Sequence, residues 1–161
     1  MLTVDTHHND GWVCEDCEDK YPYQLANVYA CSSRKVADFI DWCKQQDFYD
    51  NTTIIIAGDH DSMSSTFNEL IVGYDRKVYY TIIYPMRGLS KTENRQLCAF
   101  DFLPTTVTSL GIEYDGNRLG LGTDLFSDEK TLIEKYGEEA FFAKVKERSE
   151  YYENHIFYGF D

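Results

Sequence analysis

A run of β-branched residues, Thr52–Ala57, constrains the fold of this 161-residue chain more than any other feature. The run shows no polar alternation, which is typical of a strand covered on both of its faces. Further strands are expected at Leu2–Val4 and at Lys77–Tyr84, where Pro85 ends the second one. Strands that alternate with helical segments predict an α/β fold, in which helices cover a central sheet.

Three segments carry helix signals. Apolar residues spaced three and four apart predict an amphipathic helix over Gln24–Gln46. A helix from about Asp101 to Leu110 is predicted by Asp101 as its N-cap and by the Gly that follows Leu110 as its stop. A third helix, rich in Glu and Lys, is expected over about Glu129–Ser149, and the residues after it are aromatic without periodicity.

The organisation predicts a single partial domain over residues 1–161, with Tyr151–Asp161 as a tail. The first strand candidate begins directly from residue 1, which resembles a domain cut in the middle. No stretch approaches the roughly 20 apolar residues of a membrane-spanning helix. Met1–His8 also lacks the basic start and apolar run of a signal peptide, so the chain as given is expected to be soluble.

The charge balance excludes one class of partner. Lys and Arg total 15 against 28 Asp and Glu, which gives a net charge of −13. Such a chain repels a nucleic-acid backbone, so no nucleic acid is expected as a partner. The same charge repels an anionic substrate, so phosphate chemistry on this chain would need a bound cation to reverse the local field.

Of the five cysteines, only Cys14 and Cys17 have a telling spacing. A local disulfide and two ordinary thiols are equally good interpretations. A zinc site is a weaker one, because no second CxxC or HxxxH follows. Cys31 falls in the helical pattern and is expected to be a small buried apolar residue. The neighbouring Asp16 and Glu18 are expected to discourage thiolate formation, which argues against a catalytic cysteine.

The strongest chemical feature is Gly58–Asp61, placed directly after the Thr52–Ala57 strand. Ligands of open α/β sheets gather beyond the carboxyl ends of strands, and a sharp turn at Gly58 would let Asp59 and His60 reach one cation. The competing interpretation is an acidic, solvated loop. A second polar group, Asp5–His8, follows the first strand candidate, and surface histidines are the alternative there, especially for His8.

Five segments together, in this order and spacing, resemble the lipoteichoic acid synthases and phosphoglycerol transferases of the alkaline phosphatase and sulfatase superfamily. The segments are Val4–His7, Tyr29–Ser32, Thr52–His60, Phe100–Thr105 and Leu119–Thr123. The resemblance implies a mostly parallel sheet between helices. It also implies transfer of a phosphoglycerol group from a lipid or glucan donor through a phosphothreonine intermediate, on the extracytoplasmic side of the membrane.

Carried over by position, Asp59 and His60 match two ligands of a divalent metal, commonly manganese, with zinc, magnesium or calcium as alternatives. His7 matches the histidine that holds the substrate phosphate. The chain departs from the pattern at His8 and Asn9, where the family often has an aromatic residue and a proline. The family's nucleophilic threonine and acidic metal ligand precede the His7 position, so no catalytic nucleophile is expected in this chain.

The sequence therefore predicts the C-terminal portion of a metal-dependent phosphoglycerol transferase-like enzyme that is inactive or very weak alone. Two other classes stay open. One is a fragment of a sulfatase, phosphodiesterase or phosphoethanolamine transferase, and the other is a noncatalytic interaction module. A homodimer formed through surface that the absent half would cover is also expected. The module would separate His7 from the Asp59 and His60 pair, whereas the enzyme would bring all three to one cleft.

Overall fold

The structure is a computed structural model that describes residues 2–7, 9–63, 65–83 and 94–159. The chain forms two compact units, Met1–Met86 and Arg87–Asp161, and each is described here by itself. The expectation of a single partial domain stays a prediction beside this division. In the part of the chain that the structure describes, no helix combines the length and apolar character that crossing a bilayer requires.

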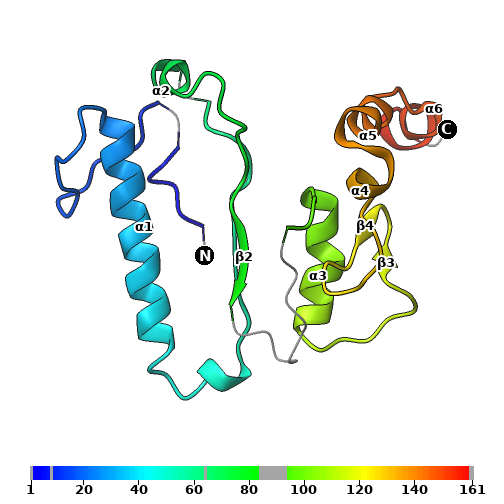
Figure 1. Cartoon of the computed structure of the whole chain (residues 1–161), viewed down its shortest axis with the longest axis horizontal. Helices are drawn as coiled ribbons and strands as arrows, with labels where there is room; N and C mark the ends of the chain where they lie inside the picture. The colour runs from blue at the N-terminus through cyan, green and yellow to red at the C-terminus, as the bar shows by residue number, and fades with distance from the viewer. Residues whose placement is uncertain (1, 8, 64, 84–93, 160–161) are drawn as a thin grey trace. The chain divides into compact units, whose positions relative to one another are not determined.

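The first unit is built on the long helix α1, Gln24–Cys43, which confirms the first predicted helix (Figure 1). Its packed face carries Leu25, Val28 and Cys31, each at most 3% exposed. These residues are three apart along the chain, so they lie along one side of the helix. The helix thereby supplies the core of the unit, against which the segments before and after it pack.

A single side chain of α1 anchors the long loop before it. Asn27 is buried, and its Oδ1 accepts hydrogen bonds from the backbone N–H groups of Lys20 and Tyr21, at 2.9 and 2.7 Å. Its Nδ2 donates to the Tyr21 carbonyl at 2.8 Å and to Asp19 Oδ1 at 3.0 Å. The polar segment 9–23 is therefore tied to the helix instead of running freely over it.

We expect Asn27→Ala to loosen this loop, because two backbone N–H groups would lose their acceptor at a cost of about 2 kcal/mol. Hydrogen exchange followed by mass spectrometry should show faster exchange in peptides that cover residues 18–23. Replacement of the exposed Asn51 by Ala is the control and should leave the exchange of these peptides unchanged. Equal exchange in both variants would contradict the anchoring role of Asn27.

Two predicted strands form and pair with each other. Strand β1, Ile54–Ala57, runs antiparallel to β2, Tyr80–Ile83, with Ile54 opposite Ile83 and Ala57 opposite Tyr80. Between α1 and β1 lies the short 3-10 helix η1, Tyr49–Asn51, and the helix α2, Ser65–Leu70, follows β1. Both sheets among the described residues are two-stranded and antiparallel. They neither show nor exclude the mostly parallel sheet expected for the fold, which stays a prediction.

Two expectations for the strands are wrong. The first is that β1 is covered on both of its faces. Its three isoleucines are only half-buried and Ala57 is exposed, because a sheet of two strands gives little cover. Leu2–Val4 forms no strand in the structure. Its backbone closes local turns instead, with His7 N–H donating to the Val4 carbonyl at 3.1 Å and Trp12 N–H to the Asp5 carbonyl at 2.6 Å. Backbone groups that pair locally are not available for a strand ladder.

The second unit begins with a tight corner. The 3-10 helix η2, Ala99–Asp101, leads into helix α3, Phe102–Ser109, and the two-residue strands β3, Arg118–Leu119, and β4, Gly122–Thr123, form a hairpin. Asp101 joins these parts, because its Oδ2 accepts from Cys98 N–H at 2.9 Å and its Oδ1 from Thr123 N–H at 2.8 Å. Asp101 stands at the predicted N-cap position of α3, but its side chain makes no capping hydrogen bond to this helix and instead holds the hairpin against the start of α3.

The third predicted helix is broken in two. Helix α4, Leu132–Tyr136, and helix α5, Glu138–Val145, are separated by Gly137, whose φ of 83° lies outside the range of a right-handed helix. The aromatic tail is also helical rather than irregular, with α6 at Glu150–Tyr152 and a π-helical turn, η3, at Glu153–Phe157. The expectation of one continuous helix over Glu129–Ser149 is therefore wrong, whereas the expectation that Tyr151–Asp161 forms a tail stays a prediction.

Arg95 and Glu134 form the main polar cluster of the second unit. Arg95 Nε donates to Glu134 Oε1 at 2.8 Å, and its two terminal nitrogens donate to Glu134 Oε2 and to the carbonyls of Leu125, Ser127 and Glu129. The guanidinium of Arg95 lowers the pKa of Glu134 to about 2, and hydrogen bonds from the Thr131 and Gln96 backbone act in the same direction. This cluster fixes the start of α4 to the loop before it.

Candidate metal and phosphate site

The first unit contains a pocket of about 480 Å³ that collects the residues singled out from the sequence. Its lining comes from the N-terminal segment, from Leu25 and Tyr29 of α1, from the loop after β1, and from the segment before β2. His7, Asp59 and His60 all belong to this lining. The structure therefore brings the three predicted site residues to one concave surface.

The loop after β1 depends on a close approach at Gly58. A Cβ atom at this position would lie 2.9 Å from Val78 Cγ1, closer than such atoms normally come. The Gly58 N–H donates to the Tyr79 carbonyl at 2.9 Å and so extends the pairing of β1 with β2 by one residue. The strand pair thereby ends at a defined point, and Asp59 and His60 follow it directly into the pocket.

Asp59 and His60 lie close enough to share one cation. His60 Nε2 is 3.5 Å from Asp59 Oδ2, and the side chains are 56% and 82% exposed, respectively. His60 Nδ1 lies 2.7 Å from the Asp61 carbonyl oxygen, which accepts a hydrogen bond when Nδ1 carries the proton. That tautomer leaves the lone pair on Nε2, the usual arrangement of a metal-binding histidine. The pair thus fits two positions of a metal ion's coordination shell.

The pair does not make a complete metal site within the described residues. No further His, Cys, Asp or Glu joins Asp59 and His60 in a group of three converging ligand atoms there. His7 lines the same pocket but is not part of such a group. His8 lies outside the described residues. Two ligands give a weak site, so tight metal binding would need ligands from elsewhere.

Two basic residues in the pocket were not singled out from the sequence. Arg76 and Lys77 stand just before β2, and both line the pocket. Arg76 donates to the Ser62 carbonyl at 2.7 Å, and its Nε lies 3.9 Å from Asp61 Oδ2. Lys77 pairs with Asp75 at 2.8 Å, so the positive charge that Arg76 and Lys77 bring to the pocket is partly balanced by acidic neighbours. The sequence signal that could have identified Arg76 and Lys77 is the pair of adjacent basic residues at the start of the predicted strand.

Cys14 and Cys17 lie away from this pocket and meet a third cysteine, Cys31 of α1. The prediction that the acidic neighbours discourage thiolate formation is wrong for Cys14. Lys35 Nζ lies 3.1 Å from the Cys14 sulfur and 2.9 Å from Asp16 Oδ2, so the acidic neighbour is neutralised. The hydrogen bond from Lys35 is the main reason why the pKa of Cys14 falls to about 7.

Several curated proteins that are similar to this chain carry the name phosphoglycerol transferase I. Phosphoglycerol transferase I of Citrobacter koseri is 28% identical over 134 residues, which cover 80% of this chain and 17% of that protein. The proteins of the same name from Salmonella choleraesuis and Escherichia coli are 28% and 29% identical over the same coverage. The resemblance to phosphoglycerol transferases is confirmed.

This chain spans only 17% of the length of the phosphoglycerol transferases I that it matches. The similarity is therefore to one portion of these longer proteins. No family model matches the chain, and no solved structure matches it.

Proposed function

We propose that this chain forms part of the active site of a metal-dependent phosphoglycerol transferase-like enzyme, which moves a phosphoglycerol group from a lipid or glucan donor. The observation that carries the proposal is the common pocket of His7, Asp59 and His60. The names of the relatives support the class of reaction. A noncatalytic module gives no reason for these three side chains to line one pocket.

Five residues of the pocket have a proposed role. Asp59 and His60 hold a divalent metal, with Mn²⁺ as the first candidate and Zn²⁺, Mg²⁺ or Ca²⁺ as alternatives. Bound there, the metal would neutralise phosphoryl charge as a Lewis acid. His7 holds a phosphate oxygen, and Arg76 adds positive charge to the same surface. The backbone carbonyl of Asp61 keeps the His60 ring oriented by accepting a hydrogen bond from its Nδ1–H group.

The remaining expectations belong to the same proposal. The nucleophilic threonine and the acidic metal ligand would come from sequence outside these 161 residues. The chain alone would then be inactive or very weak. In the whole protein, β1 and β2 would join a larger, mostly parallel sheet on the extracytoplasmic side of the membrane. The exposed surface would support a homodimer of the chain as given.

Manganese binding tests the central part of the proposal. We expect the chain to bind Mn²⁺ weakly in calorimetric titration, and Asp59→Asn or His60→Ala to weaken this binding by at least about tenfold, because each removes one of two ligands. The measured quantity is the dissociation constant at fixed pH and salt. Electron paramagnetic resonance of free Mn²⁺ gives an independent measure of the bound fraction.

Asp38→Asn is the matched control. Its side chain is exposed, as that of Asp59 is, and it does not line the pocket. The control removes the same charge from the same unit and should leave the dissociation constant within about twofold of the parent, since screened surface charges act weakly. Equal binding by the parent, Asp59→Asn and His60→Ala would refute the metal site.

A further inference from the structure

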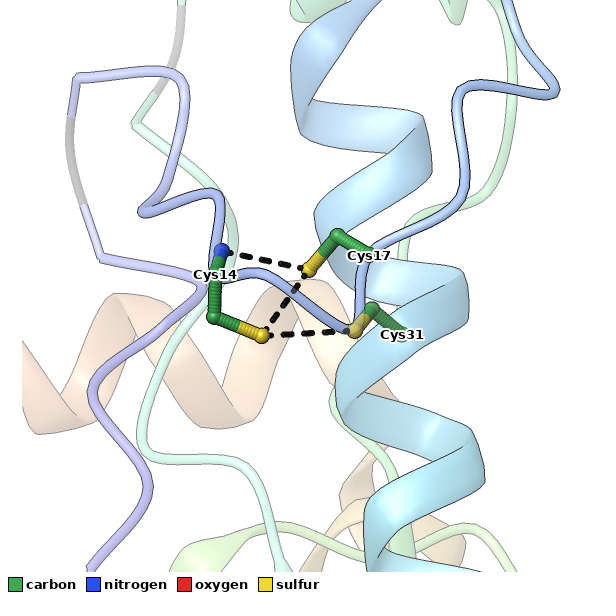
Figure 2. A group of neighbouring side chains, drawn as sticks. All are labelled: Cys14, Cys17 and Cys31. Atoms are coloured by element: carbon green, nitrogen blue, oxygen red, sulfur yellow. Dashed lines mark hydrogen bonds between the residues drawn. The ribbon is translucent and has the colours of Figure 1, made fainter.

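Three cysteine sulfurs converge where the loop before α1 meets the helix (Figure 2). The sulfur of Cys14 lies 3.4 Å from that of Cys17 and 3.9 Å from that of Cys31. All three sulfurs lie within 4.8 Å of one another, and none is in a disulfide. Cys14 and Cys17 come from the loop, whereas Cys31 comes from the packed face of α1, so the fold itself assembles the group.

The spacing of the sulfurs suits a tetrahedral metal ion. A Zn–S bond of about 2.3 Å places two thiolate ligands of a tetrahedral site about 3.8 Å apart. Two of the three separations, 3.4 and 3.9 Å, lie on either side of this value, and the third is within 4.8 Å. The loop supplies two ligands at a CxxC spacing, the usual ligand pair of structural zinc sites, and the helix supplies a third.

Positive and N–H groups face the sulfurs. Lys35 Nζ donates to the Cys14 sulfur at 3.1 Å, and Arg34 approaches the Cys31 sulfur at 3.8 Å. The backbone N–H of Cys14 donates to the Cys17 sulfur at 3.4 Å. Donors of this kind stabilise thiolates around a bound metal.

We propose that Cys14, Cys17 and Cys31 bind Zn²⁺ as three thiolate ligands, with water in the fourth position. The bound ion fastens the polar loop 9–23 to α1 at a second point, beside the Asn27 anchor. Each thiol releases its proton to solvent as its sulfur binds the metal, so binding strengthens as the pH rises. This site is separate from the proposed phosphate pocket and does not depend on its function.

Metal titration of the reduced 161-residue chain tests the proposal. We expect one equivalent of Zn²⁺ to bind in competition with a chromogenic chelator. We also expect Co²⁺ to give thiolate charge-transfer absorption together with the visible bands of a tetrahedral ion. Cys31→Ser should weaken Zn²⁺ binding more than about 100-fold, because even partners outside the coordination shell cost about 10- to 100-fold when they are removed.

Cys43→Ser is the matched control, since Cys43 is also a buried cysteine of α1 but lies outside the group. It should bind Zn²⁺ as the parent does. Cys14→Ser provides a second ligand variant in the loop, where the helix packing is untouched, and should lose affinity as Cys31→Ser does. Circular dichroism confirms that each variant is folded.

Three results would overturn the zinc site. The first is a reduced chain that binds no stoichiometric Zn²⁺. The second is equal affinity of Cys31→Ser and Cys43→Ser. The third is Co²⁺ binding without thiolate absorption. Intact-mass analysis of protein purified without reductant adds a further outcome, because a disulfide between two of the three cysteines, with no metal bound after reduction, would assign the group to a disulfide instead.

Discussion

Replacing Gly122 with Ala is expected to lower the free energy of unfolding of the second unit by more than about 3 kcal/mol. A Cβ atom at this position would lie 1.9 Å from the Phe100 carbonyl oxygen and 3.0 Å from Pro104 Cδ. Neither neighbour can move easily, because the Phe100 carbonyl belongs to the backbone of η2 and the Pro104 ring is fixed in the first turn of α3. The hairpin must therefore move away from the helix.

That movement would break buried hydrogen bonds. Thr123 N–H donates to Asp101 Oδ1 at 2.8 Å, and Leu125 N–H donates to Thr105 Oγ1 at 3.1 Å. Each backbone N–H left without an acceptor costs about 1 to 3 kcal/mol. The loss adds to the steric cost, which is why the expected effect exceeds that of an ordinary substitution in a small core.

Thiol labelling at Cys98 gives a local measurement, because Cys98 is the one cysteine in the sequence of the second unit. The denaturant midpoint for its labelling should fall clearly in Gly122→Ala. Gly120→Ala is the control in the same hairpin, where the φ of +60° makes the change strained but no atom lies within 4 Å of the added Cβ. It should cost about 1 kcal/mol. Equal midpoints for the two variants would show that close packing at Gly122 does not make its substitution more destabilising than that of Gly120.

Acidification is expected to remove on the order of 3 kcal/mol of stability from the second unit through Glu134 alone. In the folded chain, the pKa of this carboxyl is lowered from its ordinary value of 4.5 to about 2, first by the hydrogen bond from Arg95. A depressed pKa means that the folded state favours the charged form. The contribution is therefore complete above pH 4.5 and is lost as the pH falls from 4.5 toward 2.

The Glu134→Gln variant isolates this contribution from those of other carboxyls. Urea unfolding followed by far-UV circular dichroism, at several pH values between 2 and 6, should show a smaller loss of stability on acidification in the variant than in the parent. Glu147→Gln is the control, because Glu147 pairs with Lys144 at 2.9 Å but is 60% exposed. An exposed pair contributes at most about 1 kcal/mol, so its pH profile should follow the parent. Parallel profiles of the parent and Glu134→Gln would contradict the prediction.

Local sequence signals identified the elements that depend on local physics. The apolar spacing over Gln24–Gln46 found α1 to within three residues of its end, because an amphipathic face repeats at the helical period. The β-branched run found β1, and Asp101 with the Gly after Leu110 marked α3. Gly137 is visible in the sequence, but a single Gly inside a charged helical pattern does not by itself show that the helix ends there.

Features that depend on distant contacts were not visible in the sequence. Cys31 is a small buried residue, as predicted, but nothing in the helix pattern shows that Cys14 and Cys17 lie beside it. The Leu2–Val4 strand was predicted from β propensity, yet a strand needs a partner, and the turn bonds of Val4 and Asp5 take its place. Placement of His7 and Asp59 at expected strand ends predicts a shared cleft if the chain belongs to an enzyme, and both residues line one pocket, although the sequence gives no distances between them.

The antiparallel pair of β1 and β2 also has a consequence for concentrated solutions. Within the described residues each strand pairs with the other alone, so each has a second side that no further strand occupies. An isoleucine-rich strand in that position is a template for strands of another molecule. Because β1 and β2 present different sequences, contact between them across molecules would be head-to-tail and would not close into a pair. Association by this route would yield growing chains of molecules and poor solubility, whereas the expected homodimer would need a different, self-complementary surface.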